Sequence, residues 1–210
     1  FLMTDTATPP LTPRPAGPRP KSAARPVLER LFALYPSMFG ARFLPLKLGV
    51  YQELLALHPD DFKKEELKLA LGQHARSTRY LEAVASGAPR HDLNAQPVEP
   101  VAPEHVHHAI LEVYRRRLSR DKAAATQWLR ARLVAAIEAS GLARDAYLER
   151  MPTPDPVAAA VLDEAFAELA ERAAKREALR RAFAASGKTA EEFADMYGMD
   201  LAVVKQAVAT

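Results

Sequence analysis

Six cations and one tyrosine between residues 47 and 90 are the side chains in this sequence whose types and spacing most suggest a binding site. They are Lys47, Lys64, Lys68, Arg76, Arg79, Tyr80 and Arg90. Lys64 and Lys68 are four residues apart, so on a helix their ammonium groups project from the same side. Glu65 and Glu66 would then point about 100–200° away from them. Such a face can bind phosphates, although cations at mixed spacing more often form an ordinary solvated surface.

Tyr80 and Arg90 allow two interpretations. Tyr80 lies at helical spacing from Val84, which is typical of a core residue. At a surface, a phenol can instead stack on a base or bond a phosphate, and an arginine can bind phosphate through two parallel hydrogen bonds. The residues alone leave both interpretations open.

Other chemistries find little support in the sequence. The absence of cysteine excludes disulfides, thiolate zinc sites and cysteine nucleophiles. His105 and His108 have helical ligand spacing, but no acidic partner stands at a third matching position. Ser77, Thr78 and Ser86 suggest no nucleophile with a base. We therefore expect no metal, no cofactor and no enzymatic activity.

The charge distribution is mildly asymmetric. The 210-residue chain has a net charge of +3, with 14 cations against 11 anions in residues 25–120 and 12 against 14 in residues 121–210. The excess cation therefore lies in the N-terminal half, where a modest patch would suffice for phosphate contact. No apolar run approaches the ~20 residues of a membrane span, and no signal peptide is visible. We expect a cytoplasmic protein without membrane contact.

Helical periodicity dominates the middle of the chain, while residues 1–24 are rich in proline and poor in large apolar side chains. We expect this leader to be disordered. Pro36 should end the first helix, Asp60 or Asp61 should cap the third, and Gly87 should stop a short helix through Val84. Helices are predicted from Pro26 to Tyr35, from about Lys47 to Leu57, from Asp61 through Leu71, and through Leu81 and Val84.

A small β-hairpin is predicted over residues 90–101, around a turn at Asn94, with Pro97 and Pro100 restricting it to edge pairing. Pro103 and Glu104 then open a helix that reaches Arg120. Beyond it, further helices are predicted near residues 121–140, 157–185, 189–196 and 200–209.

The C-terminal part contains two similar segments, which form an internal repeat. Residues 137–147 (IEASGLARDAY) match residues 183–193 (FAASGKTAEEF), each unit being a helix, a Ser-Gly stop and a short helix with an aromatic residue. Two copies do not make a solenoid. We expect two similar helical hairpins that pack together.

An ordered set of motifs resembles the ProQ/FinO family of bacterial RNA-binding domains over about residues 25–118. It comprises Phe39, the PLKLG segment 45–49, Arg79-Tyr80-Leu81 and the GAPRHDL segment 87–93. The resemblance implies that the cations of the second and third helices line a concave, positively charged RNA-binding surface. It also implies that Tyr80 and Arg90 share a pocket for the 3′ end of RNA, and that the segment 45–49 starts a phosphate-binding helix together with Lys47.

Three positions depart from the family pattern. Lys63 replaces a hydroxyl residue, so that an Asp61 cap would place a carboxylate near any phosphate; Ala85 replaces a cation of some relatives; and Asn94-Ala95 replaces Asp-Gly in the hairpin turn. These differences predict weaker binding. The arginines at 115–117 and 120 either complement their own helix dipole or add contacts with duplex phosphates.

We expect a mainly α-helical chain, with a ProQ/FinO-like domain over residues 25–120 containing a small β-hairpin, and a helical C-terminal extension over residues 121–210. The resemblance implies an RNA-binding RNA chaperone whose partners are structured small RNAs and mRNA 3′ ends, especially terminator hairpins with single-stranded tails, acting in post-transcriptional regulation. One alternative is a helical protein–protein interaction module. Another is a DNA-binding regulator, because residues 189–207 suggest a helix-turn-helix.

Overall fold

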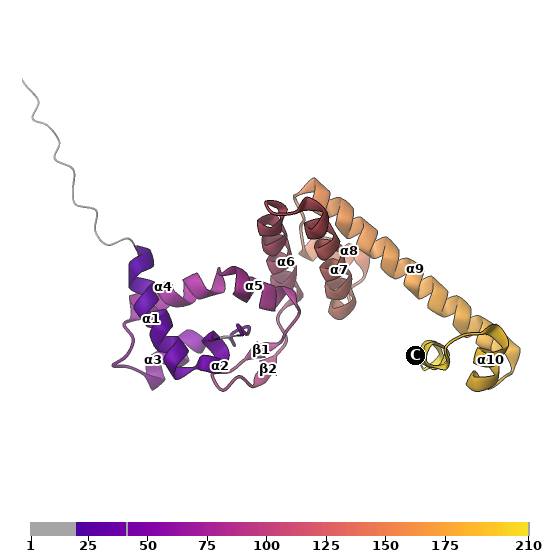
Figure 1. Cartoon of the computed structure of the whole chain (residues 1–210), viewed down its shortest axis with the longest axis horizontal. Coiled ribbons are helices and arrows are strands. Elements are labelled where there is room, and N and C mark those ends of the chain that lie inside the picture. The colour runs from indigo at the N-terminus through magenta and orange to yellow at the C-terminus, as the bar shows by residue number, and fades with distance from the viewer. Residues whose placement is uncertain (1–19, 41, 210) are drawn as a thin grey trace, which may run out of the picture.

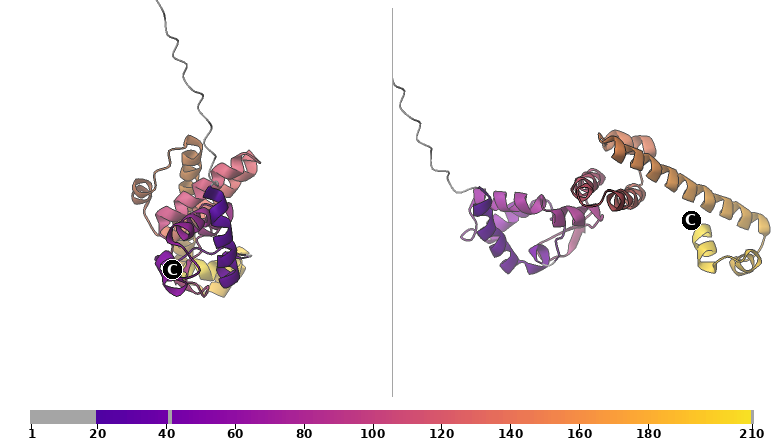
Figure 2. Two further views of the ribbon diagram at one scale, coloured as in Figure 1. Left: turned by 90° about the vertical axis from the view of Figure 1, so that its left-hand side faces the viewer. Right: turned by 45° about the horizontal axis from the view of Figure 1, so that its top comes forward.

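A computed structural model describes residues 20–40 and 42–209 of the chain. These residues form a helical N-terminal half with a small hairpin, a central group of helices, and one long helix with two short helices at its far end (Figure 1). The right-hand view of Figure 2 shows the same elongated arrangement, and the left-hand view shows it end-on. The mainly helical fold class is therefore confirmed. Most of the predicted leader lies outside the described residues.

The first helix, α1 (Pro20–Leu34), begins earlier than its apolar stripe predicts. Ala24 is buried, so the core starts within the segment that we expected to be disordered. Leu31 is also buried, whereas the neighbouring Phe32 is 52% exposed. Pro36 ends the helix as predicted and opens the short α2 (Pro36–Phe39).

The next three helices are α3 (Val50–Leu57), α4 (Lys64–Ala75) and α5 (Thr78–Ala85). The prediction that a helix starts near Lys47 was wrong, because α3 begins at Val50. The predicted Asp61 cap was also wrong: Lys63 occupies the N-cap of α4, while Asp61 binds Arg30 at 3.0 and 3.1 Å. Gly87 adopts a φ of +78° just after α5, which is the left-handed stop predicted there.

The predicted hairpin consists of β1 (Arg90–His91) and β2 (Pro97–Glu99), paired antiparallel. A third segment joins it, because Leu46 forms a parallel bridge with His91. His91 donates its N–H to the Pro45 carbonyl at 2.7 Å and accepts a bond from the Lys47 N–H at 2.9 Å. Residues 45–47 are thus extended alongside β1, which is why α3 starts only afterwards.

The central helices are α6 (Pro103–Leu118), α7 (Lys122–Ser140) and α8 (Arg144–Arg150). His107 of α6 is buried and bonds the Tyr147 hydroxyl of α8 and the Thr153 hydroxyl, both at 3.0 Å. Glu104 forms an ion pair with Arg150. Because Leu129 and Leu133 of α7 belong to the same buried cluster as α1–α6, the extension shares one core with the N-terminal half.

The last helices are α9 (Pro156–Ser186), α10 (Ala190–Tyr197) and α11 (Leu201–Val208). The two copies of the internal repeat have the same local structure. Gly141 and Gly187 have φ of +63° and +61°, and Tyr147 and Phe193 are both buried. The two hairpins pack together as predicted, because Arg130 of α7 pairs with Glu164 and Glu168 of α9, and the Tyr147 ring of α8 packs against Phe166 of α9. Phe193 and Val204 form a separate small cluster at the far end of α9.

Two buried histidines make the fold sensitive to acid. Burial, with a smaller contribution from the Arg79 charge, lowers the pKa of His74 to about 4. Burial likewise lowers the pKa of His107 to about 4. The ordinary value is 6.5, so between these two pH values the unfolded chain binds protons that the native chain does not. Stability therefore falls as the pH decreases from 6.5 towards 4.

Replacing His74 by Phe should reduce the slope with which the free energy of unfolding decreases between pH 6.5 and 4. Each histidine contributes up to about 1.4 kcal/mol per pH unit within the window. His74 packs against Phe39, Phe43 and Tyr80, and its buried Nε2 has no hydrogen-bond partner among the described residues, so a phenyl ring suits the site. Urea unfolding at several pH values checks this. The wild-type chain is the reference, and a His74→Phe slope equal to the wild-type slope would contradict the assignment.

Candidate nucleic-acid interface

The predicted basic face of α4 exists as an exposed row. Lys64 and Lys68 project from one side of the helix, and Arg76 at its C-cap continues the row. Within residues 20–40 and 42–209 none of these three side chains forms an ion pair or hydrogen bond. The buried face of α4, which includes Leu67, Ala70 and His74, points away from them. The three cations are therefore available to an anionic partner.

Gly72 occupies the remaining position of this row, four residues after Lys68 and four before Arg76. A β-carbon built at Gly72 would stand 3.4 Å from the Nη1 and Nη2 atoms of Arg76. The Arg76 guanidinium therefore folds back over the glycine and partly fills the gap. The row has cations at three of four positions.

Gly72→Lys should complete the row and strengthen binding of a hairpin RNA. One added phosphate contact makes the salt dependence steeper by about 0.7–0.9 in log K per log salt, which is about five- to eightfold in affinity near 0.1 M salt. Gly72→Gln is the matched control, since both variants gain about 1 kcal/mol of helix stability over glycine. Equal RNA affinity of the Lys and Gln variants, measured by salt titration, would show that RNA does not follow this row.

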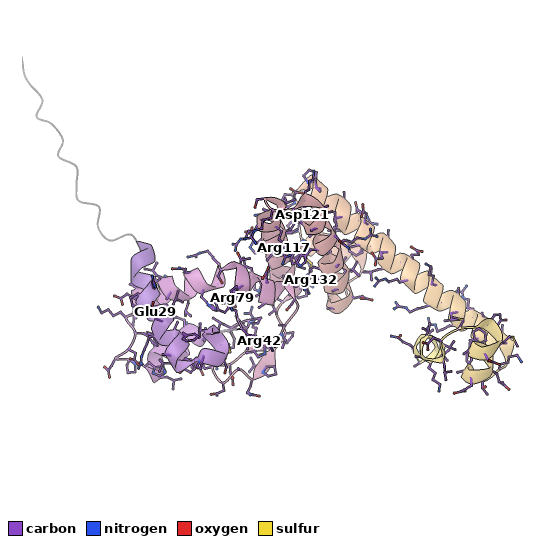
Figure 3. All side chains as sticks on the ribbon, in the orientation of Figure 1. Glu29, Arg42, Arg79, Arg117, Asp121 and Arg132 are labelled. Atoms are coloured by element: carbon purple, nitrogen blue, oxygen red, sulfur yellow. The ribbon has the colours of Figure 1, made fainter. Side chains whose placement is uncertain are left out.

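Arg79 lies on a stack of rings beside the row. Its guanidinium carbon is 4.4 Å from the centre of the Phe43 ring, and Phe43 packs on His74 with ring centres 4.4 Å apart. The preceding Arg42 is exposed and has no ion pair among the described residues (Figure 3). We did not select Arg42 or Phe43 from the sequence. The sequence feature that could have identified them is a cation directly followed by an aromatic residue within the segment that contains the motifs.

Tyr80 and Arg90 are brought together at one residue, Leu46. The Tyr80 hydroxyl accepts the Leu46 N–H at 3.0 Å, and Arg90 Nη1 donates to the Leu46 carbonyl at 2.9 Å. Tyr80 is 9% exposed and packs in the core, as one of our two interpretations required. Burial raises the pKa of its phenol, so it keeps a proton to donate. Both side chains hold the extended segment 45–47 beside β1.

Arg90 has further polar neighbours at the surface end of this cluster. Its Nη2 lies 3.2 Å from Nδ1 of His105, and its Nε lies 3.8 Å from a Glu99 carboxylate oxygen. The Arg90 side chain is 13% exposed. A terminal phosphate or ribose that reached Arg90 would compete with Glu99, whose side chain is 43% exposed and free to move away.

Lys47 differs from its predicted place. It follows the extended segment, three residues before α3, and its ammonium group pairs with Glu53 at 2.9 Å. With its side chain only 28% exposed, Lys47 is already neutralised. The idea that it adds charge to a helix start was therefore wrong.

The arginine turn at the end of α6 contributes to structure. Arg116 donates to the Arg76 carbonyl at 3.0 Å and to the Thr78 hydroxyl at 2.9 Å, which ties α6 to the α4–α5 junction. Arg117 pairs with Glu82 at 2.8 Å and lies 4.6 Å from the centre of the Trp128 ring. These two side chains hold elements together, while Arg120 remains exposed.

The departures from the family pattern have separate structural outcomes. Asp61 is held by Arg30, so its carboxylate does not cap α4. Ala85 is buried, so this position lies beneath the surface. Ala95 adopts a φ of +59°, a conformation that glycine favours, and Asp92 stabilises this turn by accepting the N–H groups of Asn94 and Gln96 at 2.9 Å.

The extension contrasts with the α4 row, because most of its cations are neutralised by acids on the same or adjacent helices. Arg130 pairs with Glu164 and Glu168. The other paired cations are Arg144, Arg150, Arg172, Lys175, Arg180, Arg181 and Lys205. Within the described residues, no helix is long and apolar enough to cross a membrane, and no cluster of three ligand side chains could hold a metal ion.

Comparison with known proteins agrees with the motifs. An RNA chaperone ProQ from Shewanella frigidimarina is 38% identical over 103 residues, which cover 47% of this chain and 49% of that protein. That of Shewanella baltica is 35% identical over 141 residues, 64% of this chain and 66% of that protein. A solved FinO-like RNA chaperone from Neisseria meningitidis is 32% identical, with a TM-score of 0.38, over 42% of this chain and 92% of that one.

The chain spans about half the length of the curated relatives it matches. The model of the ProQ/FINO family matches residues 22–126, half of the 210 residues. This match includes α4, α5, the hairpin and α6. The chain belongs to the ProQ/FinO family.

Proposed function

We propose that this protein is an RNA chaperone that binds structured small RNAs and transcript 3′ ends, such as terminator hairpins with single-stranded tails. The observation that carries the proposal is the row of Lys64, Lys68 and Arg76, which have no acidic partners among the described residues, in a chain whose extension neutralises most of its own cations. Side chains that bind phosphates through their charge bind RNA of any base sequence. The row therefore suits the backbone of an A-form stem.

The Tyr80–Arg90 cluster supports the second half of the proposal. Arg90 keeps hydrogen-bond donors at the edge of the hairpin, and the nearby Arg79 guanidinium lies over the Phe43 ring. Guanidinium planes and aromatic rings are the groups on which unpaired bases stack. A single-stranded 3′ end that leaves the stem would meet both kinds of group.

The proposal is tested with one hairpin in several forms. A hairpin with a free 3′ hydroxyl and a tail should bind more tightly than the blunt hairpin or the tailed hairpin with a 3′ phosphate. A change of stem sequence that keeps the pairing should have little effect. Equal affinity for all these RNAs would reject the 3′-end site, and absence of binding would reject the function.

The alternatives have less support. In the helix-turn-helix interpretation α11 would read DNA, but its Lys205 is paired with Glu191 at 2.8 Å. An interaction module in the extension would leave the α4 row without a role. RNA that co-purifies with the full chain, and not with a chain whose α4 row is neutralised, would favour the RNA proposal over both.

A further inference from the structure

A cavity of about 340 Å³ lies where the extension packs against the N-terminal half. Ala85 at the end of α5 and Val101 after β2 form one wall, and Ala136 and Ala139 of α7 form the opposite wall. Its lining is mostly apolar, and Arg132 is the one charged side chain among the described residues that line it. The cavity exists only because α7 docks beside α5 and α6.

Arg132 is a cation without a counter-ion at this site. Its guanidinium carbon lies 5.9 Å from the Trp128 ring centre, and no ion pair involves it among residues 20–40 and 42–209. Figure 3 shows Arg132 and Arg117 where α6 and α7 meet. A half-buried guanidinium beside an apolar surface has lost part of its hydration, so it favours an anionic partner. Two residues earlier on the same helix, Arg130 is fully engaged by Glu164 and Glu168.

Several residues that line the cavity are close in sequence to Arg90 and its hydrogen-bond and ion-pair partners. Gly87, which lines it, stands three residues before Arg90, and Pro100 follows the Arg90 partner Glu99. Val106, another lining residue, follows the second Arg90 partner, His105. A single-stranded RNA segment bound at Arg90 would therefore lie near residues that line the cavity.

We propose that this cavity binds one nucleotide of the single-stranded segment of the bound RNA, with Arg132 on its phosphate and the apolar walls against its base and ribose. The volume falls in the range of sites that hold small ligands, about 300–1,000 Å³. The inference rests on the proposed function and deepens it, because the C-terminal extension becomes part of the RNA site.

The first test compares Arg132→Gln with Arg130→Gln in the full chain. Both remove one positive charge from α7, and only Arg132 faces the cavity. Arg132→Gln should weaken binding of the tailed hairpin about fivefold near 0.1 M salt, which is one single-strand phosphate contact, and leave the blunt hairpin unchanged. Arg130→Gln should change neither. Thermal melting of the same samples checks that the α6–α7 contact survives.

The second test fills the cavity without changing the charge. Ala139→Leu adds volume on the α7 wall, at a position that is exposed and therefore has room for a larger side chain. It should lower affinity for the tailed hairpin and spare the blunt one, with an unchanged melting temperature. If Arg132→Gln and Ala139→Leu both keep the wild-type ratio of tailed to blunt affinity, the cavity is not a nucleotide site. A wild-type chain with no preference for the tailed hairpin would instead reject the proposed function itself.

Discussion

Replacing Lys64, Lys68 and Arg76 together by alanine should weaken binding of a tailed hairpin RNA by about two orders of magnitude near 0.1 M salt. Each phosphate contact contributes about 0.7–0.9 to the slope of log K against log salt, so three contacts amount to about a hundredfold or more at this salt concentration. The row lies on the exposed face of α4, and none of its side chains forms a hydrogen bond or ion pair with another described residue, so the fold should be retained. Affinity is measured by salt titration with several stem sequences, all of which should be affected alike.

The matched control is the triple replacement of Arg172, Lys175 and Arg181 by alanine. These residues are also exposed on one helix and carry the same total charge, but each is paired with Glu168, Glu171 or Glu177. Net charge changes equally in both triple variants. If the two variants lost affinity to the same extent, the effect would be one of overall charge and the α4 row would not be the binding surface.

Arg90→Ala should lower affinity for RNA with a free 3′ end by roughly 10- to 100-fold, and affinity for the blunt hairpin much less. Charge-assisted hydrogen bonds are worth about 1.5–3 kcal/mol each, which corresponds to that range. Tyr80→Phe should act on the same site, because both side chains bind Leu46. Combined in one chain, the two changes should therefore have less than additive effects on RNA affinity.

Stability must be followed on the same samples, since these residues also hold the fold. Tyr80→Phe leaves the buried Leu46 N–H without its acceptor, at a cost of about 1–3 kcal/mol, so its melting temperature should fall. Arg144→Ala, which removes an arginine paired with Asp163 on the extension, is the control for loss of one charge. Near-normal affinity of a folded double variant for the tailed RNA would refute the assignment of the 3′-end site.

Local signals predicted much of the arrangement that presents these residues. Pro36 and Gly87 end their helices as expected, and the turn at Asn94 places β1 against β2. These features depend on the backbone preferences of single residues, which a sequence displays directly. The spacing of Lys64 and Lys68 likewise predicted a shared exposed face, because both lie within one uninterrupted helix.

The errors arose where distant segments determine local structure. The segment 45–47 has helical neighbours in the sequence, but its hydrogen bonds with His91 and the Tyr80 hydroxyl extend it beside β1. Lys47 consequently meets Glu53 instead of standing free at a helix start. Asp61 does not cap α4 as predicted, because its carboxylate binds Arg30, which is 31 residues earlier in the chain. The cavity at Arg132 could not be predicted either, since α5 and α7 form it from opposite sides.

The most direct test of RNA binding by the α4 row is the salt dependence of affinity of the intact protein for a hairpin with a 3′ tail. Log K should fall linearly with log salt with a slope of about −2 or steeper, which is the contribution of Lys64, Lys68 and Arg76 at about 0.7–0.9 each. A slope near zero would contradict the account, because binding would then not depend on phosphate contacts at the unpaired row.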